Sequence, residues 1–209
     1  MHASASITLA GSTLTGLRHV CAFFRDTEEM FRVLLTFILE GLAKREKAIH
    51  IVSANNIDLH LGHLAAAGVD VDAVLANGQL QIVEWNKSYF HGGAFEEEAA
   101  LQVIDQLLTD AREQGYPRAR LLGDMDWVLE NRLGTENCAS YEARLNDMVI
   151  HHPEDVVVCA YDLSRFGGSA VLDVMRTHPT AIVGGILQQN PFYTDPKEML
   201  RELRTRGKE

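Results

Sequence analysis

The sequence predicts an α/β protein whose mainly parallel sheet is flanked by helices on both faces, a three-layer sandwich. Short apolar runs alternate with amphipathic helical segments along the chain, as in sheets built from right-handed strand–helix–strand crossovers. Residues 155–161 are apolar almost throughout, which is typical of a strand buried on both faces. A length of 209 residues with 46% hydrophobic content is sufficient for one such domain.

The first strand–helix–strand unit occupies residues 19–52. Its predicted parts are a strand at 19–24, a polar loop at 25–29, a helix at 30–42 and a strand at 48–52. In nucleotide-binding proteins the loop of such a unit carries the glycines and the lysine that hold phosphate. The loop here has neither, and its three acids would repel a triphosphate. The sequence therefore predicts that ATP is not bound.

This loop also contains a signal for the start of the helix. Asp26 followed by Glu29 has the spacing of a capping box, in which two side chains satisfy free amides at a helix N-terminus. The later elements alternate in the same way. In order, they are a helix at 57–67, a strand at 79–85, a helix at 95–114, a strand at 119–123, a helix at 140–151, a strand at 155–161, a helix at 169–177, a strand at 180–187 and a helix at 196–205.

The chain shows one domain, at residues 18–206, with a flexible N-terminal arm before it. Residues 1–17 are rich in Ser, Thr, Gly and Ala, with a candidate short strand at 7–9. The net charge of −10 opposes direct binding of nucleic acid. Three cysteines without CxxC spacing fit reduced thiols, and neither a signal peptide nor an 18-residue apolar run is evident, so a cytoplasmic protein without membrane contact is expected.

Candidate functional residues lie at strand ends, because ligands of open α/β sheets bind beyond the carboxyl ends of the strands. We expect a partly apolar pocket there. Trp127 is expected to line it, with Asp124 as its polar contact, His19 and Cys21 behind it, and Phe24 and Tyr161 at neighbouring strand ends.

A metal site is the alternative interpretation of part of this group. His19 and Cys21 lie on one face of their strand, as do Cys159 and Tyr161 on theirs, and a histidine, two thiols and an acid could hold a metal. Free cysteines are usually small core residues, however, so a structural role is favoured and no metal is assigned. His60 and His63 could also share a metal, but no third ligand is in register, and a surface pair is the simpler interpretation.

A collinear set of motifs spans residues 19–193. They are His19-Val-Cys-Ala-Phe-Phe24, Glu40-Gly-Leu42, Tyr89 with Gly93 and Phe95, Arg120-Leu-Leu-Gly-Asp-Met-Asp-Trp127, Tyr141-Glu142 with Asn146, Cys159-Ala-Tyr161, His178-Pro179 and Asn190-Pro-Phe-Tyr193. In this set the chain resembles the MEDS sensory domain, named for methanogens, methylotrophs and a dichloromethane-responsive repressor. It departs from the family at Gly123-Asp-Met-Asp-Trp127, where a Gly-Glu-Met-Ser-Trp pattern is usual.

The resemblance implies a KaiC-like or RecA-like core with a degenerate phosphate loop, usually joined to a DNA-binding domain or a histidine kinase. It also implies sensing of small organic or hydrocarbon-like compounds. The ligand-binding residues it suggests, on matched motifs, are His19, Cys21, Phe24, Tyr89, Arg120, Asp124, Trp127, Glu142, Cys159, Tyr161 and His178. Because no output segment is visible in the chain, a separate partner is expected.

The expected function is a non-catalytic sensor that binds a hydrocarbon-like or C1-derived ligand and regulates a transcription factor or histidine kinase. Two alternatives stay open. One is a degenerate ATPase-like interaction protein, and the other is a small-molecule hydrolase using Asp124 or Asp126 with His178. No GxSxG nucleophile motif accompanies these residues. The sequence identifies no cofactor and leaves open whether the protein forms a homo-oligomer.

Overall fold

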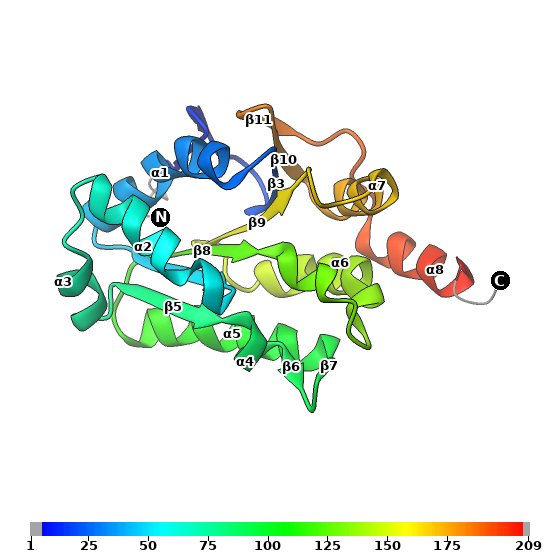
Figure 1. The fold of residues 1–209 in the computed structure, drawn as a ribbon. Helices are drawn as coiled ribbons and strands as arrows, with labels where there is room; N and C mark the ends of the chain where they lie inside the picture. Colours follow the sequence, from blue (N-terminus) through cyan, green and yellow to red (C-terminus); the bar gives the residue numbers. More distant parts are fainter. Residues whose placement is uncertain (1–5, 207–209) are drawn as a thin grey trace.

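The computed structural model, which describes residues 6–206, is built around a seven-stranded sheet of order β11-β10-β3-β9-β8-β4-β5 (Figure 1). The strands are β3 (His19–Phe24), β4 (Lys47–Val52), β5 (Leu80–Glu84), β8 (Ala119–Asp124), β9 (Val156–Asp162), β10 (Thr180–Val183) and β11 (Ile186–Gln189). β11 pairs antiparallel with β10, and the other pairs are parallel.

Helices cover both faces of this sheet (Figure 1). One face carries α1 (Thr27–Ala43), α2 (Ile57–Ala66) and the short α3 (Val71–Ala76). The other carries α5 (Glu97–Glu113), α6 (Cys138–Val149) and α7 (Gly168–Thr177), while α4 (Trp85–Ser88) follows β5 and α8 (Pro196–Arg206) packs against α6. The predicted α/β fold with a mainly parallel sheet is therefore confirmed.

Side chains of the central strands alternate between the two cores. In β3, Cys21 and Phe23 point into the core beneath α5 and α6, while Phe24 points into the core beneath α1. β9 runs in parallel register, with Cys21 opposite Cys159 and Phe23 opposite Tyr161. The prediction that residues two apart share a face is confirmed for both strands, and the alternation assigns each candidate residue to one side of the sheet.

The predicted capping box forms in part at the start of α1, because Asp26 caps the helix while Glu29 bonds the amide of Arg25, one residue before the N-cap. The carboxylate of Asp26 accepts a hydrogen bond from the amide of Glu29 at 2.7 Å, and the carboxylate of Glu29 accepts one from the amide of Arg25 at 2.9 Å. The loop therefore satisfies its own amides with its own carboxylates.

The N-terminal segment differs from the expected flexible arm in its described part. β1 (Thr8–Leu9) and β2 (Ser12–Thr13) form a hairpin, and Ile7, Leu9 and Leu14 are buried in the core beside α1. This part packs because Ile7 and Leu9 alternate with exposed Thr8, and Leu14 beyond the hairpin joins them on the face that α1 covers. Residues 1–5 of the expected arm lie outside the described residues.

The strand expected at 180–187 is two strands. Gly184 and Gly185 both have positive φ, of 59° and 76°, and form a tight turn that reverses the chain between β10 and β11. A second small hairpin, of β6 (Phe90–His91) and β7 (Ala94–Phe95), occupies the glycine-containing loop before α5. In the part of the chain that the structure describes, no helix is long and apolar enough to cross a membrane.

Candidate functional site

A cleft lies at the carboxyl edge of the sheet, between the ends of β3, β8 and β9 and the start of α1. It has about 380 Å³ of empty space, part of it open to solvent. Its walls include Phe24, Asp26, Met30, Asn56, His60, Asp124, Asp126, Ala160, Tyr161 and Asp162. Of the residues expected at this edge, the structure brings Phe24, Asp124 and Tyr161 into one cleft.

Asp124 is held in place by two hydrogen bonds. Its Oδ1 accepts from the amide of Asp126 at 2.9 Å and its Oδ2 from the Asn56 side chain at 3.0 Å. Burial raises the pKa of Asp124 above its ordinary value. Burial and the neighbouring Asp124 raise the pKa of Asp126 to about 6, although Asp126 forms an ion pair with Arg165. At neutral pH the cleft therefore carries negative charge, which disfavours an anionic ligand.

His60 also lines this cleft. The sequence indicated a surface pair with His63 and did not place His60 in the cleft. Its side chain packs edge-on against Phe31 of α1, with ring centroids 4.8 Å apart, and the residue is 1% exposed. Burial lowers its pKa to about 4, so the ring is neutral at pH 7. Its Nδ1 has no hydrogen-bond partner among the described residues, and the ring can therefore offer a polar atom to a ligand.

Trp127 does not line the cleft, contrary to expectation. It lies in η2 (Met125–Glu130), a 3-10 turn that begins after Asp124, and its indole enters the opposite core. There it stacks on Phe95 with centroids 4.3 Å apart and meets Tyr89 and Tyr141 edge-on at 5.6 and 6.0 Å. Trp127 and Tyr89 are thus members of a buried aromatic cluster.

Arg120 also has a structural position. It is 2% exposed, its Nε donates to Glu46 at 2.5 Å, and its guanidinium lies 4.5 Å from the centre of the Phe37 ring. Gly41 makes room for it, since a Cβ on Gly41 would lie 2.7 Å from Cδ of Arg120. The Glu40-Gly-Leu42 and Arg120 motifs therefore meet in an ion-pair network beneath α1.

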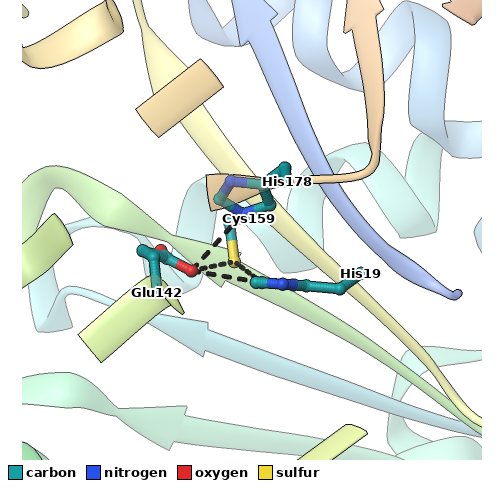
Figure 2. A group of neighbouring side chains, drawn as sticks. All are labelled: His19, Glu142, Cys159 and His178. Atoms are coloured by element: carbon teal, nitrogen blue, oxygen red, sulfur yellow. Dashed lines mark hydrogen bonds and ion pairs between the residues drawn. The ribbon is translucent and has the colours of Figure 1, made fainter. Parts of the chain in front are cut away.

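Four of the other candidate residues meet in a second, fully buried group on the α6 side of the sheet. Figure 2 shows His19 from β3, Glu142 from α6, Cys159 from β9 and His178 from the end of α7 converging around one carboxylate oxygen. Glu142 Oε2 lies 3.1 Å from Nε2 of His19, 3.3 Å from Nε2 of His178 and 3.6 Å from Sγ of Cys159. The sequence could not relate Glu142 and His178 to His19, because α6 and α7 are distant from β3 along the chain.

Two influences shift the pKa of Glu142. Burial raises it, whereas His178 and His19, when they carry a proton on Nε2, lower it below its ordinary value. The hydroxyl of Tyr161 donates to Oε1 of the same carboxylate at 2.7 Å. Cys21 stands beside the group without joining it, as its thiol points to the carbonyl of Thr180 at 3.8 Å.

The residues of the hydrolase alternative lie in two separate places, the cleft and the buried group around Glu142. Asp124 and Asp126 line the cleft, whereas His178 is 0% exposed and contacts Glu142 on the other side of the sheet. An acid–base pair needs hydrogen-bond reach of a shared substrate atom. The arrangement proposed for that hydrolase is therefore not assembled.

Comparisons with known proteins agree with this fold. The sequence model of the MEDS family, the methanogen/methylotroph, DcmR sensory domain, matches residues 18–179. The transcriptional repressor DcmR of Methylorubrum extorquens is 23% identical over 179 residues, which cover 84% of this chain and 63% of the repressor. A KaiC-like protein from the hyperthermophilic archaeon Pyrococcus horikoshii superposes with a TM-score of 0.56 at 13% identity, covering 78% of this chain and 70% of that one. The chain thus spans less than two thirds of the repressor's length.

Proposed function

This chain belongs to the MEDS family of sensory domains, and from that premise we propose that it is a non-catalytic sensor that binds a small organic molecule and regulates a partner protein. The binding site in this proposal is the cleft at the carboxyl edge of the sheet. The observation that carries the proposal is the self-capped loop beside the cleft, where carboxylates occupy the place at which a nucleotide-binding relative of this fold would present free amides.

The loop disfavours a nucleotide for two reasons. The amides of Arg25 and Glu29 already donate to carboxylates of the loop itself, so a phosphate would have to displace them. The cleft also contains Asp26, Asp124 and Asp126, whose charges repel polyphosphate. A KaiC-like sheet with this edge is therefore suited to a ligand other than ATP.

The walls of the cleft suit a small, uncharged organic compound. Phe24, Met30 and Ala160 supply apolar surface, and Asp124 and His60 supply polar atoms. The empty space of about 380 Å³ includes open solvent, so the enclosed part admits only a small molecule. A hydrocarbon-like or C1-derived ligand with one hydrogen-bond donor toward Asp124 fits these properties.

The partner in this proposal is a transcription factor or a histidine kinase. The support is that a 23% identical relative is a transcriptional repressor. The cleft also joins the ends of three strands to the start of α1, so a bound ligand contacts several elements at once. Such a ligand would stabilise the arrangement of these elements that binds it best, and would thereby change the surface that they present to a partner.

Isothermal titration calorimetry with short alcohols, amines and halogenated methanes tests the proposal. At least one compound should bind saturably, and Asp124→Asn should weaken it by about tenfold, the loss of one hydrogen bond to a charged group. Asp72→Asn is the matched control, because it makes the same charge change at an exposed residue of α3 outside the cleft. If no compound binds, or if both variants bind like the wild type, the site is wrongly placed.

A further inference from the structure

The buried group of His19, Glu142, Cys159 and His178 has the composition of a metal site. It offers two imidazole nitrogens, one carboxylate oxygen and one thiol, and these four ligand atoms all lie within 4.8 Å of one another. Zn²⁺ binds such nitrogen, oxygen and sulfur ligands in tetrahedral sites. The four residues come from β3, α6, β9 and the end of α7, so the folded chain assembles the group from distant segments.

Four of the six ligand–ligand distances match the edges of a zinc tetrahedron, and all six are within 4.8 Å. Zinc–ligand bonds of about 2.0–2.2 Å for N and O and about 2.3 Å for S require nitrogen–oxygen separations of about 3.3 Å and sulfur–nitrogen or sulfur–oxygen separations of about 3.6 Å. The two histidine Nε2 atoms lie 3.1 and 3.3 Å from Glu142 Oε2. The Cys159 thiol lies 3.5 Å from His19 Nε2 and 3.6 Å from Glu142 Oε2.

Hydrogen bonds on the far side of both rings leave the Nε2 atoms free to ligate. His19 Nδ1 lies 3.1 Å from Oδ1 of Asn146, whose amide nitrogen donates to backbone carbonyls, among them that of Thr177 at 2.7 Å. Nδ1 of His178 lies 2.9 Å from the carbonyl of Val174, which can only accept. Each Nδ1 therefore carries the proton, and each neutral ring presents the lone pair of Nε2 to the carboxylate.

With both Nδ1 atoms protonated, the unprotonated Nε2 atoms of the two rings face a carboxylate oxygen, which is also a hydrogen-bond acceptor. Two Nε2 lone pairs face Oε2 of Glu142 at 3.1 and 3.3 Å, and Nε2 of His178 has no hydrogen-bond partner among the described residues. Protonating both rings would resolve the conflict, but it would bring two cations together with ring centroids 4.1 Å apart in a site that excludes water. A single divalent cation resolves it without that repulsion.

We propose that His19, Glu142, Cys159 and His178 form a closed, structural Zn²⁺ site that attaches α6 and the end of α7 to the central strands β3 and β9. With the thiol deprotonated on binding, the charges of the thiolate and of Glu142 balance the metal, so the buried centre is neutral. Four protein ligands leave no open position for substrate, which separates this site from a catalytic zinc. The sequence alone favoured a structural role for His19 and Cys159 without metal, because Glu142 and His178 could not be placed beside them.

Metal content and a cobalt spectrum test the proposal. Protein produced with zinc in the medium should keep about one zinc per chain through dialysis against a weak chelator, measured by plasma mass spectrometry. The Co²⁺-substituted protein should show the thiolate-to-cobalt charge-transfer band and the strong visible bands of a tetrahedral site. Wild-type protein with far less than one metal per chain, or cobalt without the thiolate band, would overturn the proposal.

Cys21→Ala is the matched control for Cys159→Ala. The two cysteines are directly opposite each other in register, but the Cys21 thiol points to Thr180 instead of the group. Cys159→Ala should lose the charge-transfer band and Cys21→Ala should keep it, and the reverse result would refute the assignment. If Cys159→Ala fails to fold, the wild-type stoichiometry and spectrum still decide.

The ligand cleft is tested separately from the metal. Asp124→Asn changes the cleft on the opposite side of the sheet and should keep the full metal content and cobalt spectrum. Failure of the ligand titration would therefore leave the zinc site standing, and loss of the zinc site would leave the ligand site open to its own test.

Discussion

Replacing Trp127 with alanine should destabilise the fold strongly, because its indole fills the core beneath α5 and α6 and lies outside the cleft. Trp127 is 0% exposed, stacks on Phe95 and makes edge contacts with Tyr89 and Tyr141. Truncation removes the indole and leaves a cavity that these three rings can fill only in part.

The loss of unfolding free energy can be estimated from this packing. Truncating a fully buried tryptophan to alanine costs about 3–5 kcal/mol of unfolding free energy, and loss of the aromatic contacts places this case in the upper half of that range. Trp127→Phe should cost much less. It keeps the ring stacking, and it removes an indole N–H that has no hydrogen-bond partner among the described residues.

Urea unfolding followed by far-ultraviolet circular dichroism measures both losses. The chain has two tryptophans, so Trp85→Phe leaves Trp127 as the only indole for a fluorescence titration with any ligand that binds by calorimetry. The emission should not change. A loss below about 1 kcal/mol for Trp127→Ala, or ligand-dependent emission, would show that the indole borders the binding site and would refute this placement.

Three further predictions follow from the loop, the cleft and the ion pair of Arg120. Calorimetry with magnesium and millimolar ATP should give no saturable heat, because the loop amides are already bonded to Asp26 and Glu29. The folded state raises the pKa of Asp126 from 3.8 to about 6, so this group stabilises the fold below pH 3.8 and that contribution is lost as pH rises to about 6. The urea midpoint of the wild type should fall relative to that of Asp126→Asn over this range, and parallel curves would contradict the shift. Gly41→Ala should lower the unfolding free energy by about 1–3 kcal/mol, because its Cβ would overlap Arg120. Gly62→Ala should not destabilise the protein, because its Cβ meets nothing within 4 Å. Equal thermal shifts for both variants would refute the steric argument.

The local features of this protein follow from its sequence because they depend on residue spacing alone. Asp26 caps the amide of Glu29 as their three-residue separation predicts, and the alternation of β3 puts His19 and Cys21 on one face. The missing glycines and the acids of the loop likewise predicted a degenerate phosphate loop. The Gly184-Gly185 pair was a turn signal of the same local kind, and it marks the hairpin that a single predicted strand overlooked.

The composition of the two sites was decided by the tertiary structure. Asp124 and Trp127 are three residues apart, yet the 3-10 turn between them sends their side chains to opposite sides of the sheet. Glu142 and His178 reach His19 because crossovers place α6 and the end of α7 over β3 and β9. Spacing along the chain carries information over a turn or a strand, whereas contacts between segments more than a hundred residues apart depend on strand order and on how helices pack over the sheet. For this reason the sequence predicted the layers of the protein, and only the folded chain separated the cleft from the buried group of imidazoles, thiol and carboxylate.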